Sequence, residues 1–479
     1  MPPPKISIGD LPAWAHLNSI AFSNIKVAKS EGKGYGVICE RDLTSPQDSL
    51  DTPALLTVPH DLILNAAAVE EYAKEDRTFR QLLDAVGPRS SRRVLLFLLV
   101  QTALASRGSY HSSAGVLNPW TEYIQFLPET VLVPSLWTED ERFLLRGTSL
   151  ESAVNAKLSA LVAEFDTIRE ISSDIPCWNE ILWESETLSF RDWILLDALY
   201  RSRCLELPKS GESMVPCIDM INHSACPTAY YDENSEDEVT LLLRPGASIS
   251  KGEEIFISYG EAKSAAEMLF SYGFIDLEST IESLVLPLDP FPDDPLAKAK
   301  LFAFGEAPRV HVSRQNGSIV WKSPFAYLMC LNEEDGLEFL ILQETRQLNV
   351  LWQQEEVTNR MAEFETLIQS HPLCSIFKLR TITVVHGCLQ SQLERAQSNM
   401  IDALPAPKAD SSPRQECVQA ALLLRRIEIG ILEAGIEALE DEKTTLLTDE
   451  HVVSYLGSME TAESDLVDEE ASNEADDFS

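Results

Sequence analysis

Three short segments in the middle of the chain end apolar runs with polar or phenolic side chains. Asn222 and His223 follow the mostly apolar run of residues 214–221, Tyr259 closes a second apolar run, and Tyr272 begins a turn. Polar groups at the ends of buried segments present hydrogen-bonding atoms to a ligand rather than to the protein's own core. An amide, an imidazole and two phenols in this order therefore predict a binding site for a polar ligand.

Each of these residues also has an ordinary structural interpretation. A tyrosine at a strand end is usually a core residue with a solvated hydroxyl, and a buried histidine is usually a structural one. Asn222-His223-Ser224 fits the N-glycosylation pattern. Glycosylation needs secretion, however, and the first residues lack the apolar core of a signal peptide. Only the ordered set favours a ligand site over these alternatives.

A glycine-rich bend, Glu31 to Gly36, precedes these motifs near the N-terminus. It lacks the Gly-Lys-Ser/Thr ending of a phosphate-binding Walker A loop, and its spacing does not fit a dinucleotide fingerprint. On its own the bend predicts a turn, because glycine readily adopts positive φ.

Composition excludes several classes of protein. A net charge of −38 argues against a nucleic-acid surface, which needs a basic patch, whereas it suits solubility or a basic protein partner. No apolar run approaches the roughly 20 residues that cross a bilayer. The nine cysteines are widely spaced without a Cys-x-x-Cys pair, so neither a metal cluster nor a disulfide framework is indicated. We expect an intracellular protein of the cytoplasm or nucleus, with no membrane or nucleic-acid partner.

Periodicity divides the chain into strand-rich and helical parts. Residues 18–60 and 215–259 read as strands, and they bracket a long insert, about 61–207, in which apolar residues recur at helical spacing from Leu62 onward. Beyond about residue 286 the chain again reads as mainly helical. The clearest amphipathic stretches there are residues 340–370, 380–399 and 415–442.

These patterns predict three parts. The first is residues 1–286, the second is a mainly helical domain over 287–457, and the third is an acidic tail over 458–479 that we expect to be disordered.

Taken in order, the motifs resemble those of SET-domain protein methyltransferases. The bend at 31–36, Arg203 after a long helix, the segment 219–224, Tyr259, and the turn 272–274 carry the resemblance, which covers about residues 18–280. The helical insert and helical C-terminal part are similar to the branch of the Rubisco large-subunit lysine methyltransferase and its non-histone relatives. This resemblance implies an α+β fold. It comprises a SET-domain β-fold with a knot-like crossing near its end, a rare exception to unthreaded topology, and a helical domain of the substrate-binding kind.

The resemblance also implies the activity and the site. It implies transfer of a methyl group from S-adenosylmethionine to a lysine of a protein substrate. The alternatives are methylation of a protein histidine and a catalytically silent interaction module. Tyr259 is the expected catalytic residue. The cofactor would be bound by Glu31, Gly32, Lys33, Arg203, Asp219, Met220, Ile221, Asn222, His223, Tyr272, Gly273 and Phe274.

Individual roles follow from the same resemblance. The guanidinium of Arg203, with Arg201 as the alternative, would grip the cofactor carboxylate through paired hydrogen bonds, and Phe274 would lie near the adenine. Tyr259 would orient the substrate amine, with Tyr272 as a second wall of the channel. The acidic segment 232–238 reads as a hairpin tip, which is either a solvated turn or an attractor for a basic substrate.

Overall fold

The computed structural model describes most of the chain, with short gaps. Of the predicted features, Glu31, Gly32 and the acidic tail from residue 459 onward lie outside the described residues. No helix among the described residues is long and apolar enough to span a membrane. The described residues are 5–30, 33–47, 52, 54–87, 90–107, 118–184, 188–341, 347–399 and 412–458.

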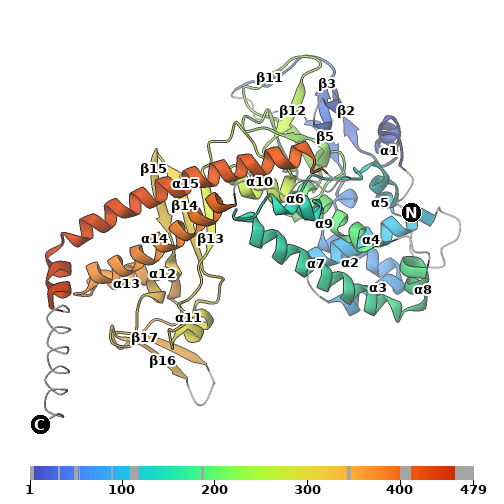
Figure 1. Cartoon of the computed structure of the whole chain (residues 1–479). Coiled ribbons are helices and arrows are strands. Elements are labelled where there is room, and N and C mark those ends of the chain that lie inside the picture. Colours follow the sequence, from blue (N-terminus) through green and yellow to red (C-terminus); the bar gives the residue numbers. More distant parts are fainter. Residues whose placement is uncertain are drawn as a thin grey trace, which may run out of the picture. The chain divides into compact units, whose positions relative to one another are not determined.

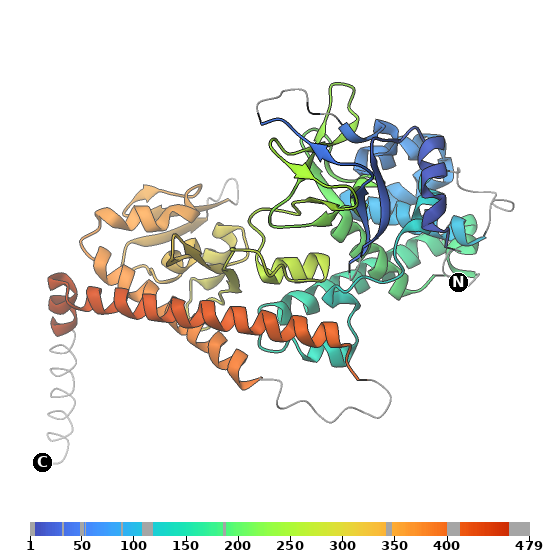
Figure 2. The same cartoon turned by 90° about the horizontal axis from the view of Figure 1, so that it is seen from above.

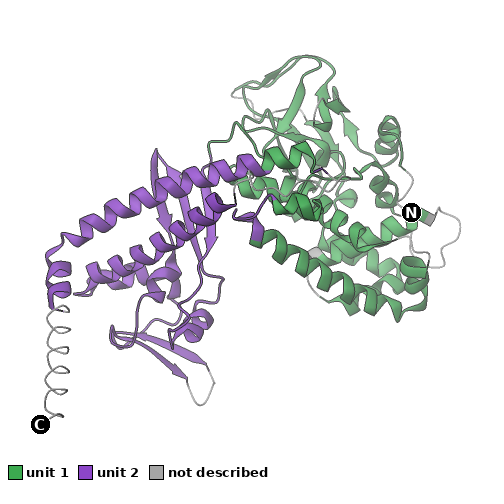
Figure 3. Cartoon of the chain, viewed as in Figure 1, with its two compact units in different colours: residues 1–143, 152–280, 413–420 green, residues 144–151, 281–412, 421–479 purple. Residues whose placement is uncertain are grey.

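The chain forms two compact units, coloured separately in Figure 3. The first unit comprises residues 1–143, 152–280 and 413–420, and the second comprises 144–151, 281–412 and 421–479. Each unit has its own hydrophobic core. The second unit thus includes a short segment from the middle of the helical insert.

Strands that precede the helical insert in the sequence pair with strands that follow it, as Figure 1 and Figure 2 show. Glu254 of β12 pairs antiparallel with Ile38 of β3, and Phe256 of β12 pairs parallel with Asn222 of β8. The two four-stranded sheets have the orders β1-β5-β10-β9 and β2-β3-β12-β8, and two smaller pairs complete the unit. The bounds are β1 Ala21–Phe22, β2 Ile25–Ser30, β3 Gly34–Cys39, β4 Leu43–Thr44, β5 Ala54–Val58, β6 Cys204–Leu207, β7 Gly211–Met214, β8 Asn222–His223, β9 Ala229–Glu233, β10 Val239–Leu243, β11 Ser248–Ile249 and β12 Glu254–Ile257.

The insert is helical, as predicted. The helix predicted from Leu62 is wrong at its start, because Leu64 is extended and pairs with Met214. The apolar run of residues 94–100 in α4 is entirely buried, which explains why it carries no polar face. The helices of this unit are η1 Ile8–Asp10, α1 Leu11–Leu17, η2 His60–Leu62, α2 Ala66–Glu75, α3 Arg77–Val86, α4 Ser90–Arg107, α5 Pro119–Tyr123, η3 Ile124–Phe126, η4 Pro134–Leu136, α6 Glu139–Phe143, α7 Leu150–Ser173, α8 Pro176–Asn179, η5 Glu180–Glu184, α9 Phe190–Arg203, η6 Ile218–Met220 and α10 Ala265–Tyr272.

The second unit contains strands that the sequence did not predict. The helix predicted over 340–370 is wrong, since Val350 and Trp352 bury alternate positions of a strand and only short helices follow. The predicted helices over 380–399 and 415–442 are confirmed as α14 and α15, which pack together (Figure 2). The bounds are β13 Ser283–Pro287, α11 Ala297–Phe304, β14 Arg309–Gln315, β15 Ser318–Lys322, α12 Pro324–Met329, β16 Leu337–Ile341, β17 Leu348–Trp352, β18 Glu355–Glu356, η7 Met361–Glu363, α13 Phe364–Leu367, η8 Ile368–Ser370, α14 Cys374–Ser398 and α15 Gln415–Leu447.

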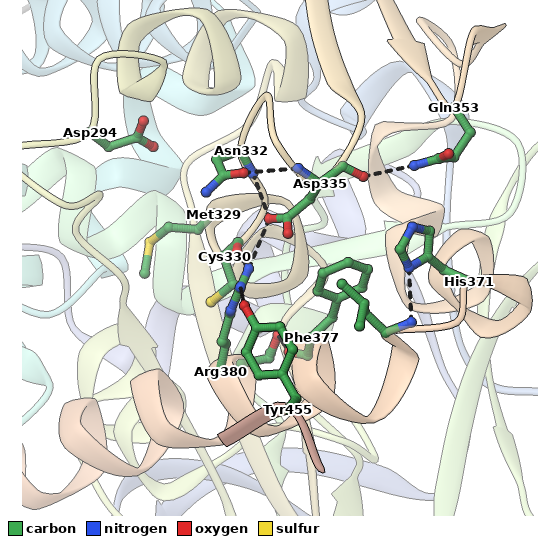
Figure 4. A network of polar contacts seen from close by, with 12 residues as sticks. Asp294, Met329, Cys330, Asn332, Asp335, Gln353, His371, Phe377, Arg380 and Tyr455 are labelled. Atoms are coloured by element: carbon green, nitrogen blue, oxygen red, sulfur yellow. Dashed lines mark hydrogen bonds and ion pairs between the residues drawn. The ribbon is translucent and has the colours of Figure 1, made fainter. Parts of the chain in front are cut away.

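A polar network fastens the turns of the second unit to α14 (Figure 4). The carboxylate of Asp335 accepts hydrogen bonds from the Asn332 backbone at 3.0 Å and from Arg380 at 2.8 Å. The other arm of Arg380 donates to the hydroxyl of Tyr455 at 3.4 Å, and Gln353 donates to the Asp335 carbonyl at 2.7 Å. The Asp335 carboxylate and the Arg380 guanidinium therefore join the turn at 332–335, α14 and the segment of Tyr455, and the Asp335 carbonyl adds Gln353.

Candidate active site

Tyr259 lies just beyond the end of β12, beside the parallel strand β8. Its backbone N–H donates to Nδ1 of His223 at 3.0 Å, and its hydroxyl donates to the carbonyl oxygen of Ile221 at 2.8 Å. The phenol is thus fixed at both ends to the predicted ligand-binding segment. Burial of the hydroxyl raises the pKa of Tyr259 well above its usual value, so the phenol stays protonated at physiological pH.

Tyr272 ends α10 and packs against Tyr259. Helix α10 begins with a reciprocal capping box between Ser264 and Glu267, and it ends at Gly273 with φ of +83°. A side chain at Gly273 would lie 2.6 Å from the backbone of Leu132, so glycine is required there. The Tyr272 hydroxyl donates to the Tyr259 carbonyl at 3.1 Å, and the two ring centroids are 4.6 Å apart. Burial raises the pKa of Tyr272 to about 12.

The side chain of Asn222 is held by a carboxylate. Its amide nitrogen donates to Glu254 at 2.6 Å and to the Tyr35 carbonyl at 3.3 Å, and the second oxygen of Glu254 accepts from the Ser30 hydroxyl at 2.7 Å. A side chain at Gly36 would place its Cβ only 2.0 Å from the Glu254 carboxylate. The glycine-rich bend therefore makes room for the group that orients Asn222.

One ring nitrogen of His223 is hydrogen-bonded, and the other faces a carboxylate. Because Nδ1 accepts the N–H of Tyr259, the ring proton lies on Nε2, which is 3.3 Å from a carboxylate oxygen of Asp276. The His223 ring centroid is 5.2 Å from that of Tyr259 and 6.1 Å from that of Phe274. This imidazole positions neighbouring groups and is not free to act as a base.

Arg203 and Asp219 form a buried ion pair. The Asp219 side chain is fully buried, and Nη1 of Arg203 donates to its carboxylate at 3.1 Å and to its backbone carbonyl at 2.9 Å. Burial raises the pKa of the Asp219 carboxyl, while the guanidinium of Arg203 opposes the shift. Among the described residues, Nε and Nη2 of Arg203 have no hydrogen-bond partner.

The guanidinium of Arg201, the alternative to Arg203, is already hydrogen-bonded to other groups of the protein. Its guanidinium bonds to Asp197 at 3.1 and 3.2 Å, to Ser135 at 3.1 Å and to the Phe270 carbonyl. A guanidinium with these partners holds helix α9 in place. Arg203 is therefore the arginine with donors left for a ligand.

Two cavities of the first unit meet at these residues. The larger has a volume of about 1130 Å³ and the smaller about 520 Å³. A ligand in one cavity and a side chain in the other would approach each other at their common wall. The residues that line both cavities are Ser202, Arg203, Asp219, Tyr259 and Tyr272.

Most of the predicted site residues line the larger cavity. Ile221 lines the smaller cavity instead, and Glu31 and Gly32 lie outside the described residues. The predicted residues on the larger cavity are Lys33, Arg203, Asp219, Met220, Asn222, His223, Tyr259, Tyr272, Gly273 and Phe274.

The smaller cavity carries carboxylates at its wall. Glu206 and Glu212 are cross-strand partners in the β6–β7 hairpin, and Glu261 joins them on the lining together with Arg201 and Lys263. Like charges directly opposite each other destabilise a hairpin. This pair places two negative charges side by side on the wall of the smaller cavity.

Comparison with known families decides the fold. Residues 34–260 match the model of the SET domain. The chain carries a SET domain. The proteins that it resembles in sequence include several named as N-methyltransferases.

Curated proteins match this chain in sequence over part of its length or, in one case, nearly all of it. SET domain-containing protein 8 of Schizosaccharomyces pombe is 29% identical over 444 residues, 91% of this chain and 95% of its own. The actin-histidine N-methyltransferase of Papio anubis is 24% identical over 350 residues, 69% of this chain and 54% of its own. Solved structures of Rubisco LSMT, one with AdoMet and one with sinefungin and monomethyllysine, have TM-scores of 0.65 and 0.64 at 18% identity. Each match covers 92% of this chain and 93% of the other.

The acidic hairpin tip of the SET domain lies away from both cavities. None of residues 232–238 lines either of them. Lys209 binds the tip, with its ammonium 2.7 Å from Asp237 and 2.8 Å from the Asn234 carbonyl. The carboxylates of Glu206 and Glu212, in contrast, line the smaller cavity.

Two residues that organise the SET site carry no sequence signal. Glu254 reads as one charge in a strand, and Tyr123 as one aromatic in the helical insert. Their importance depends on contacts with Asn222 and Asp219, residues far away in the chain. A single sequence does not encode these pairings in any local pattern.

Proposed function

We propose that this chain transfers a methyl group from S-adenosylmethionine to a lysine side chain of a protein substrate.

 The observation that carries this proposal is the wall at which the larger and smaller cavities meet. Two reactants held on opposite sides of such a wall react as if at very high concentration, because their orientation is fixed in advance.

The residues of the larger cavity fit S-adenosylmethionine. The free donors of Arg203 suit the cofactor carboxylate. Phe274 is 38% exposed and lines the same cavity, where its ring offers a face for the adenine. When bound, the cofactor supplies a methyl group already activated on a sulfonium. The protein must then orient the acceptor, exclude water and allow a proton to leave.

The acceptor amine would enter from the smaller cavity. A lysine ammonium with a pKa of about 10.4 has no lone pair to donate, so it must first lose a proton. The rings of Tyr259 and Tyr272, tilted by 33° with centroids 4.6 Å apart, provide a desolvated passage, and desolvation lowers the pKa of an ammonium. Because the Tyr259 phenol stays protonated, its part is to orient the amine and not to accept the proton. The carboxylates of Glu206 and Glu212 favour a cationic acceptor.

Two alternatives follow from other observations. The relative that methylates an actin histidine keeps histidine open as the acceptor. A silent SET module is disfavoured because the groups that the chemistry needs, Arg203, Tyr259 and Tyr272, face both cavities.

Labelled cofactor tests the proposal in two steps. The purified chain should bind S-adenosylmethionine in a calorimetric titration, and it should label at least one protein when incubated with labelled cofactor and cell lysate. The Tyr259→Phe variant should bind the cofactor but label nothing above background. A chain that binds cofactor yet labels no protein under these conditions would support the silent module instead.

A further inference from the structure

A buried tyrosine of the helical insert forms hydrogen bonds with the turn that precedes the Asn222-His223 segment. The side chain of Tyr123, the last residue of α5, is completely buried. Its hydroxyl donates to the carboxylate of Asp219 at 2.5 Å and accepts the backbone N–H of Cys217 at 2.8 Å. This hydroxyl therefore contacts the turn that leads directly into the Asn222-His223 segment.

The ring of Tyr123 is fixed by an aromatic cluster. Its centroid is 4.9 Å from Trp14, 5.2 Å from Trp120 and 6.2 Å from Phe126. These rings come from α1, α5 and η3, so two separate parts of the first unit hold the phenol. A hydroxyl at the end of a rigid ring can fix the position of its hydrogen-bond partners.

The partner turn has a strained backbone. Cys217 has φ of +70°, a left-handed conformation that non-glycine residues rarely adopt. The hydroxyl of Tyr123 accepts the N–H of this residue, and two residues later it meets the Asp219 carboxylate. Strain of this kind persists only where surrounding contacts hold it in place, and it gathers at functional sites.

Residues in and just after this turn contact side chains that line both cavities. Asp219 forms an ion pair with Arg203, which lines both cavities. Two residues beyond Asp219, the carbonyl oxygen of Ile221 accepts a hydrogen bond from the hydroxyl of Tyr259. We infer that Tyr123 is a positioning residue that sets the Asp219–Arg203 pair, and with it the free guanidinium donors, for the cofactor carboxylate. The inference rests on the proposed function and adds a role for the helical insert in building the cofactor site.

The central test replaces one hydroxyl. Tyr123→Phe keeps the ring in its aromatic cluster and removes both hydrogen bonds. We expect cofactor affinity to fall on the order of tenfold, as for loss of one hydrogen bond to a charged group. Tyr327→Phe is the matched control, because Tyr327 is a buried tyrosine of α12 in the second unit and lines neither cavity. It should leave cofactor affinity unchanged whatever it does to stability.

The pH dependence of cofactor affinity distinguishes a positioning role of Tyr123 from a role in stability alone. Asp219 is faced by Tyr123 from α5, Cys217 from its own turn, Arg203 and Cys204 at the α9–β6 junction, and Tyr259 beyond β12. Loss of the Tyr123 donor leaves the charged carboxylate less stabilised, so protonation of Asp219 should begin at higher pH. The acid limb of cofactor affinity should therefore move to higher pH in Tyr123→Phe and stay in place in Tyr327→Phe.

A second variant keeps the test decisive if Tyr123→Phe does not fold. Asp219→Asn should weaken cofactor binding at neutral pH and flatten the acid limb while Tyr123 stays intact. The inference is overturned if either folded variant binds S-adenosylmethionine with wild-type affinity and pH dependence. If the wild-type chain itself does not bind the cofactor, the proposed function fails first.

Discussion

The hydroxyl of Tyr259 donates a hydrogen bond to the backbone carbonyl of Ile221 at 2.8 Å, and so joins the end of β12 to the turn after η6. Both residues line the smaller cavity. A phenol already committed as a donor keeps its oxygen lone pairs available toward an incoming amine. This bond therefore fixes the orientation of the group on which the proposed chemistry depends.

Replacement of Tyr259 by phenylalanine should slow methyl transfer by about 10²–10⁴-fold, the usual effect of losing a positioned polar group that handles a proton. Cofactor affinity should change little, since the ring remains. Initial rates with labelled cofactor and calorimetric titration measure the two quantities separately. Tyr230→Phe serves as the control, because Tyr230 lies on β9 and lines neither cavity. Unchanged turnover in a folded Tyr259→Phe protein would refute the role.

The double substitution Glu206→Gln and Glu212→Gln should raise KM for a lysine-bearing substrate at low salt and leave kcat unchanged. The two carboxylates oppose each other on the wall of the smaller cavity, and their attraction for a cation should fade as salt screens it. Steady-state kinetics at two salt concentrations measure the effect. A matched charge change at Glu236 and Glu238, on the hairpin tip, should have little effect. Equal KM shifts for both variants would show that only net charge matters.

Gly36→Ala should weaken cofactor binding and destabilise the first unit. The new Cβ would lie 2.0 Å from the Glu254 carboxylate and displace the group that holds Asn222. Leaving that amide unpaired should cost about 1–3 kcal/mol. Gly387→Ala in α14 is the matched control, since no atom lies within 4 Å of its added Cβ, and alanine should stabilise that helix by about 0.5–1 kcal/mol. Chemical denaturation of both variants checks the opposite signs.

Glu428 should make the second unit less stable as pH rises from about 4.5 to about 7. The carboxyl is buried and accepts hydrogen bonds from the backbone and hydroxyl of Ser149, and burial raises its pKa to about 7. The folded chain therefore holds this proton at pH values where the unfolded chain has released it. The resulting stability is complete below pH 4.5 and is lost as pH rises through 7.

Replacement of Glu428 by glutamine should remove this dependence. The difference in unfolding free energy between wild type and Glu428→Gln should change by up to about 3 kcal/mol across that window, as about 1.4 kcal/mol accompanies each unit of pKa shift. Denaturation at pH 4.5, 6 and 8 measures it. A constant difference between the two proteins would contradict the assignment.

The sequence predicted the parts of the fold that repeat locally. Strands at both ends of the first unit, the helical insert, and helices α14 and α15 follow from the period of their apolar residues. The helix predicted over 340–370 failed because short strands and short helices there share apolar spacings of three and four residues, which periodicity alone does not separate.

Within the candidate site, the prediction came from contiguous motifs. Asn222, His223, Tyr259 and Tyr272 stand in recognisable segments, and the structure brings them together beside Arg203. Tyr123 and Glu254 could not be found in the same way. Each forms a hydrogen bond with a residue that is distant in the chain, and such a bond produces no pattern in the neighbouring sequence.

The most direct measurement of the central claim is the chemical identity of the methylated side chain. Proteins labelled by the chain from methyl-labelled S-adenosylmethionine would be hydrolysed to amino acids and separated against methyllysine and methylhistidine standards. The account predicts that the label is recovered as methyllysine and is absent when Tyr259→Phe replaces the wild type. Recovery of the label as methylhistidine, or its persistence at wild-type level with Tyr259→Phe, would contradict it.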